Sequence, residues 1–114
     1  MAIPSGSGTE VLKRAVTLSA NNTTTSVLTC PADTIITVLN VIFSQDVNAT
    51  KNFELSISPA GSADLHLLRG VEIPAYGSYA WESKLVLHPA DILKVWSNST
   101  DHDVLVNYIQ QDWS

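Results

Sequence analysis

Apolar and polar residues alternate in short runs along this chain, and turn residues separate the runs at intervals of about ten positions. In Asn52 to Ser58, for example, Phe53, Leu55 and Ile57 alternate with polar side chains. A period of two is typical of a strand that buries one face. About eight such runs follow one another without a helical period, so the sequence predicts an all-β, single-domain antiparallel β-sandwich of jelly-roll type. A barrel is the structural alternative.

The longest run, Thr34 to Ser44, is apolar on both faces. Strict alternation assigns Ile36, Val38 and Ile42 to one face. It assigns to the other face Ile35, Leu39, Val41 and Phe43. Because a strand that is apolar on both faces is covered on both sides, this second face is expected to meet a loop, an arm or another subunit. We interpret it as a subunit interface.

Tryptophans extend this predicted interface. Trp96 alternates in phase with Lys94 and out of phase with Leu93 and Val95, so it is expected to point outward. An outward Trp on a sheet indicates a subunit contact or a binding spot. Trp113, in the C-terminal tail, is expected to dock onto another surface.

The tripeptide Pro-Ala-Asp occurs twice, at Pro31-Ala32-Asp33 and at Pro89-Ala90-Asp91, each time between β-type runs. Pro presets the first corner of a turn, and Asp can accept hydrogen bonds from nearby backbone there. The repeat predicts a strand-corner-strand unit in each half of the chain, at related positions of the Greek keys.

Size and composition limit the function classes. The chain has 114 residues, enough for one domain with a core of its own. Its single cysteine, Cys30, allows no internal disulfide, which fits assembly in a reducing cytoplasm. Charged residues make up 15% of the chain, against roughly 25% in ordinary soluble domains, so much of the surface is easily desolvated against protein. The net charge of −5 without a Lys/Arg cluster disfavours nucleic acid as a partner, and no segment is apolar for long enough to span a bilayer.

No motif for catalysis, a metal or a cofactor is evident. His66, His88 and His102 do not have the spacing of metal ligands, and the loop around His102 is interpreted as a solvated acidic turn. We therefore expect no enzyme activity, no metal and no cofactor. Tyr76 and Tyr79 lie close together near Trp81 and could form a platform for a glycan, or pack into the core instead.

Residues 1–9 are rich in Gly, Ser and Pro and are expected to form a flexible N-terminal arm ahead of a sandwich domain at residues 10–114. The segment Ile3-Pro4-Ser5-Gly6-Ser7-Gly8-Thr9-Glu10-Val11-Leu12-Lys13-Arg14 resembles the start of short virion proteins of tailed bacteriophages, including phages of cyanobacteria and marine bacteria. Further similar pieces are Leu28 to Leu39, Leu87 to Val95 and Tyr108 to Asp112.

The resemblance implies a structural component of the virion, assembled in the host cytoplasm, with no catalytic residues. The first expectation is a capsid decoration (cement) protein, a homotrimer that clamps the major capsid protein or other virion proteins through its arm. The arm contacts would come from Ile3, Pro4, Val11, Leu12, Lys13 and Arg14. The alternative is a tail fibre or baseplate subunit, or a receptor-binding module whose glycan contacts would include Tyr76 and Tyr79.

Overall fold

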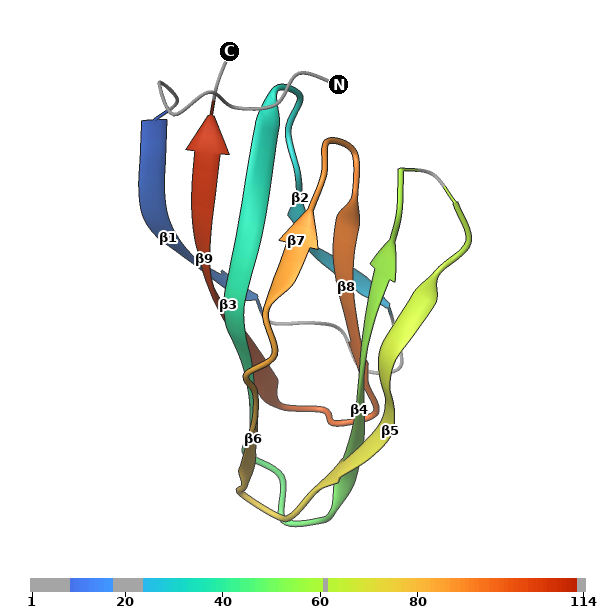
Figure 1. Cartoon of the computed structure of the whole chain (residues 1–114). Helices are drawn as coiled ribbons and strands as arrows, with labels where there is room; N and C mark the ends of the chain where they lie inside the picture. Colours follow the sequence, from blue (N-terminus) through green and yellow to red (C-terminus); the bar gives the residue numbers. More distant parts are fainter. Residues whose placement is uncertain (1–8, 18–23, 61, 113–114) are drawn as a thin grey trace.

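The computed structural model describes residues 9–17, 24–60 and 62–112 of the chain, and every regular element in them is a β-strand (Figure 1). No helix in this part of the chain is long and apolar enough to cross a membrane. The strands are β1 (Thr9–Thr17), β2 (Thr25–Thr29), β3 (Thr34–Gln45), β4 (Lys51–Ser58), β5 (Leu65–Ile73), β6 (Ser78–Trp81), β7 (Leu85–Leu87), β8 (Ile92–Ser97) and β9 (His102–Asp112).

The strands form two antiparallel sheets that face each other. The first, called the β1 sheet below, has the order β1-β9-β3-β6, and β7 pairs with the other half of β3. The second, called the β2 sheet, has the order β2-β8-β4-β5. With β6 and β7 counted as one interrupted strand, these orders are those of an eight-stranded jelly roll. The predicted fold class is therefore confirmed.

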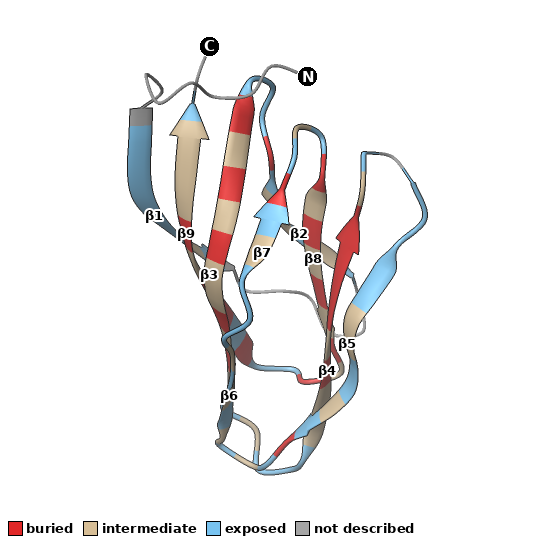
Figure 2. Ribbon diagram, in the orientation of Figure 1, coloured by how far each residue is buried: buried red, intermediate tan, exposed pale blue. Residues whose placement is uncertain are grey.

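The core lies between the sheets, where inward residues of every long central strand are buried (Figure 2). Aromatic rings join the layers where β3 ends and where β4 and β9 begin. The rings of Phe43 on β3 and Phe53 on β4 are 5.3 Å apart, and the imidazole of His102 meets Phe53 edge-on at 5.4 Å. His102 is buried and its Nδ1 lies 2.9 Å from the Ser99 carbonyl oxygen, so the prediction that it sits in a solvated turn is wrong.

A β-bulge in β3 changes the face on which its later residues lie. The pairing of β3 with β9 shifts between Val38 and Asn40, so Leu39 is an extra residue. Beyond the bulge Val41 and Phe43 point into the core and are fully buried, and Ile42 points outward. The prediction that Val41 and Phe43 belong to a subunit interface is wrong for this reason, because strict alternation cannot anticipate an inserted residue.

The Pro-Ala-Asp corners join β2 to β3 and β7 to β8, as the repeat predicted, and they are hydrogen-bonded to each other. The Cys30 N–H donates to the Asp91 carbonyl, and the Ala90 N–H donates to the Cys30 carbonyl, both at 2.9 Å. Their conformations differ, because Asp33 takes the left-handed position in the first corner (φ 55°) and Ala90 takes it in the second (φ 74°). Asp33 is exposed, whereas the buried Asp91 carboxylate accepts the N–H groups of His88 and Ala60, each at 2.9 Å.

Candidate docking face

Strand β1 is an open edge of the β1 sheet. Among the described strands it pairs with β9 alone, without a register shift from Thr9 to Thr17. Its side chains from Glu10 to Val16 are exposed except for Ala15, which packs against the core (Figure 2). Leu12 is 71% exposed and Val16 is 62% exposed. A long, regular strand with an uncovered edge and exposed apolar side chains is a template for pairing with further protein.

The strand register places the even-numbered side chains of β1 on the outer face of the sheet, next to apolar residues from β9, β3, β6 and β7. Residues that are paired across neighbouring strands point to the same face of the sheet. A series of such pairs forms a row of side chains that runs across the strands. The Leu12 row contains Leu12, Ile109, Thr37 and Val86. The Val16 row contains Val16, Leu105, Ile42 and Ala80.

A polar row separates these rows. It contains Arg14 on β1, Asn107 on β9 and Asn40 on β3, and the Asn107 Nδ2 donates to the Asn40 Oδ1 at 2.8 Å. Arg14 has no ion pair with any other residue that the structure describes. Between the Leu12 and Val16 rows, the outer face thus has apolar bands on either side of a band that carries one cation and a pair of amides.

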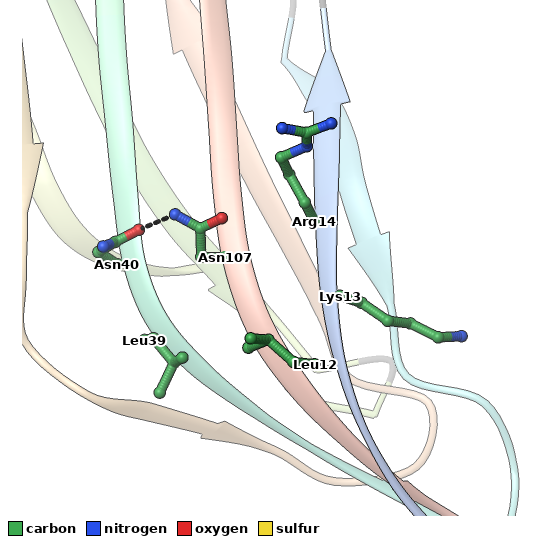
Figure 3. Close-up of a pocket in the computed structure, with 6 residues that line it drawn as sticks. All are labelled: Leu12, Lys13, Arg14, Leu39, Asn40 and Asn107. Carbon is green, nitrogen blue, oxygen red and sulfur yellow. Dashed lines mark hydrogen bonds between the residues drawn. The ribbon is translucent and has the colours of Figure 1, made fainter.

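An open groove of about 600 Å³ lies over the polar row (Figure 3). It is lined by Leu12, Lys13, Arg14, Leu39, Asn40 and Asn107. Arg14 and Leu12 extend from β1 toward β9, whereas Lys13 extends away from the other labelled residues. The bulge brings both Leu39 and Asn40 to this surface, so the irregularity that turns Phe43 into the core also shapes the groove. We call the rows and the groove together the docking face.

The residues that were predicted to form the arm contacts do not lie on one surface. Ile3 and Pro4 lie outside the described residues, as does the arm itself up to residue 8, while Thr9 already belongs to β1. Leu12 and Arg14 lie on the docking face. Val11 and Lys13 lie on the opposite side of β1, where the Lys13 Nζ donates to the Gln110 Oε1 at 3.4 Å.

The predicted interface residues are not brought together either. Ile35 and Leu39 lie on the outer side of the β1 sheet and are half-buried. Trp96 points outward as predicted, but from the β2 sheet, on the opposite side of the sandwich, where it is paired with Glu54. Trp113 lies outside the described residues.

Sequence reasoning missed most of the docking face, including Asn40, Ile42, Leu105, Asn107 and Ile109. A signal was present in β9, where Leu105 and Ile109 are out of phase with the inward residues Val104, Val106 and Tyr108. That strand is apolar on both faces, as β3 is. Its outer face should therefore also have been predicted to contact other protein.

The possible glycan residues are also separated. Tyr76 is 63% exposed and has a left-handed backbone (φ 55°) in the turn between β5 and β6. Tyr79 is paired with Phe43 and packs against the core beside Trp81. The two tyrosines do not form one platform.

The described residues that could bind a metal or act as a nucleophile do not form a reactive site. The described residues contain no cluster of His, Cys, Asp or Glu suited to a metal ion. Cys30 is buried and its Sγ lies 3.2 Å from the Thr34 carbonyl oxygen. Burial raises the pKa of the Cys30 thiol, a backbone hydrogen bond from Ile36 opposes the shift, and the nearby Asp91 charge adds a smaller increase. This thiol is a protonated packing residue at neutral pH.

Comparisons with known proteins bear on the fold. No protein-family model and no curated protein matches the chain. Among solved structures, it is similar to a protein of Bacillus endospore appendages, described as a novel family of disulfide-linked pili, with a TM-score of 0.58, 10% identity, and coverage of 100% of this chain and 97% of that one. It is also similar to the Clostridium thermocellum endo-1,4-beta-D-xylanase 10B CBM22-1-GH10 modules complexed with xylohexaose, with a TM-score of 0.47, 13% identity, and coverage of 94% of this chain and 22% of that one. At these identities the likeness concerns the fold alone.

Proposed function

We propose that this chain is a non-catalytic structural subunit of a tailed-phage particle, a capsid decoration protein that attaches to neighbouring shell proteins through the docking face. The observation that carries the proposal is the exposed apolar surface of the β1 sheet. Of the six large hydrophobic side chains that are exposed in the described residues, three lie on the docking face, namely Leu12, Val16 and Val86, and Val11 lies on the other side of β1. Exposed apolar surface of this kind marks a protein interaction site.

The resemblance to phage virion proteins also supports a role for β1 in attachment. Its most specific segment, Ile3 to Arg14, ends in β1, the strand that exposes Leu12. The remaining arm residues precede β1 directly and would extend the contact along the shell. The apolar side chains of the arm and of the docking face would contact capsid protein.

A decoration protein does not need tight binding at each site. Many copies on a repeating lattice gain avidity from a modest contact. Complete burial of an exposed Leu or Val stabilises a contact by about 1.5–3 kcal/mol, so the exposed members of the Leu12 and Val16 rows suffice for such an affinity. The uncharged character of both rows keeps the desolvation cost low.

The test is attachment to particles, measured by density-gradient banding with purified virions. The wild-type chain is expected to co-band with the particles at a fixed copy number. Val16→Asp places a carboxylate in an apolar row and is expected to reduce occupancy at least about tenfold, since a charge would be desolvated without a partner. Leu65→Asp on β5, where Leu65 is 57% exposed, is the matched control and should leave occupancy unchanged.

A wild-type chain found only in the unassembled fraction would contradict the proposal. Equal occupancy of the Val16→Asp and wild-type chains would contradict the assignment of the face. Thermal melting of both variants checks that each is folded.

A second candidate is a receptor-binding module of a tail fibre or baseplate that recognises a glycan on the outer face of the β2 sheet. Trp96 lies there next to Glu54, whose Oε1 is 3.9 Å from the His66 Nδ1, and Lys94 pairs with Asp64 at 3.1 Å. An aromatic ring beside polar groups suits a sugar. A glycan array should then give reproducible binding that Trp96→Ala abolishes, and an array without binding would count against this candidate.

A further inference from the structure

The geometry points to a specific partner for the β1 edge: the β1 edge of a second copy of this chain, paired antiparallel about a twofold axis at Leu12. This pairing would supply the oligomeric unit of the assembly role proposed above. It joins the β1 sheets of both copies, each five-stranded, into one continuous sheet.

Strand β1 has the geometry of a pairing edge. β1 is nine residues long, and its pairing with β9 is regular over its whole length. No other described strand pairs with its outer side. A regular edge of this length offers a row of backbone N–H and C=O groups to another strand of the same shape.

The charged side chains of β1 are complementary to those of a second, antiparallel copy. On the outer face of the β1 sheet, β1 presents Glu10, Leu12 and Arg14 in succession. When two antiparallel copies are aligned with Leu12 opposite Leu12, Glu10 of each copy lies directly opposite Arg14 of the other. Directly opposed side chains in an antiparallel pair have Cβ atoms about 5 Å apart, which allows ion pairs. Neither Glu10 nor Arg14 has an ion pair with another described residue of its own chain.

Neighbouring registers of the two β1 strands lack this charge complementarity. A shift of one residue would move every side chain of the partner strand to the other face of the sheet. The alternative registers therefore differ from this one in steps of two residues. A shift in one direction places Lys13 opposite Lys13, and a further shift places Arg14 opposite Arg14. A shift in the other direction removes both ion pairs, and a further one places Glu10 opposite Glu10. Among these registers, only the one centred on Leu12 makes the charges complementary. The twofold axis then forms the pair between Glu10 and Arg14 twice, once on each side of Leu12.

The pairing would also bury the most exposed apolar side chain of the strand. Leu12 is 71% exposed in the single chain and would contact its symmetry mate at the axis. Val16 lies beyond the charged pairs and stays available on the outer face. The pair of copies would therefore present a docking face of twice the width to the shell.

Sedimentation velocity of the full chain and three variants tests this inference. The wild-type chain should sediment as a dimer with twice the mass of the 12.3 kDa monomer. Arg14→Glu or Glu10→Arg alone should raise the dimer Kd at least about tenfold, because two attractive contacts become two repulsive ones. The exchange of both residues, Glu10→Arg with Arg14→Glu, should restore the Kd to within about threefold of the wild-type value, since the ion pairs reform with reversed polarity.

Arg69→Glu on the β5 edge is the control and should leave the Kd unchanged. A chain that remains monomeric up to about 1 mM overturns the inference. So does a dimer or trimer that is insensitive to the single exchanges, or a double exchange that fails to restore association. A monomer that still co-bands with particles would overturn this pairing alone, and a dimer that is absent from particles would overturn the decoration role alone.

Discussion

The edge strands β1 and β5 have the same length, nine residues, but they are built differently. Both expose a leucine, Leu12 on one and Leu65 on the other. The pairing of β1 with β9 is unbroken, whereas the pairing of β5 with β4 shifts its register twice and includes Gly70 in a left-handed conformation (φ 66°). Irregularity protects an edge from pairing because a second strand cannot match it. The comparison teaches that backbone regularity, rather than an exposed leucine alone, distinguishes a docking edge from an inert one.

The largest expected effect comes from placing the same charge on each edge. Leu12→Asp is expected to raise the Kd of self-association about a hundredfold, because it removes the apolar contact at the axis and opposes two carboxylates there. Leu65→Asp should leave the Kd unchanged. Sedimentation equilibrium of both variants measures this, and an equal effect of the two substitutions would remove the distinction between the edges.

A smaller effect concerns what makes β5 irregular. Gly70→Ala should lower the free energy of unfolding by about 1 kcal/mol, because an L-residue is strained at this backbone conformation. A Cβ at this position would meet no atom within 4 Å, so the cost would come from the backbone alone. Urea denaturation measures it. Self-association should not change, and a gain in association would instead suggest that Gly70 is the residue that keeps β5 unpaired.

The smallest effect is that of salt. The pairs between Glu10 and Arg14 of different copies would lie at the surface, where ions screen them. Raising the salt concentration from about 0.1 M to about 0.5 M should increase the dimer Kd by about threefold. The Arg14→Glu variant should show the reverse trend, since screening then weakens a repulsion. A wild-type Kd that does not respond to salt would argue against these ion pairs.

The fold could be predicted from the sequence because its determinants are local. Alternation in β4 and β8, and proline at each corner, indicate strands and turns without knowledge of their partners. The jelly-roll type followed from the number and spacing of the strands, and the pairing orders confirm it.

What could not be predicted depends on contacts between distant segments. The bulge at Leu39 arises from the match of β3 to β9, and it decides that Phe43 is in the core. The Pro-Ala-Asp corners are identical in sequence, but only Asp91 accepts an N–H from Ala60, a residue far from it in the chain. His102 looks solvated beside its acidic neighbours, but it is buried and its ring meets Phe53, a residue of a distant strand, edge-on.

Imaging of intact particles at side-chain resolution is the decisive experiment for attachment through the docking face. We expect each copy of this chain to place β1 and the outer face of its sheet against other protein, with Leu12 and Val16 covered and Leu65 in solvent. Density that shows Leu12 and Val16 in open solvent on every copy, or particles without this chain, would contradict the account.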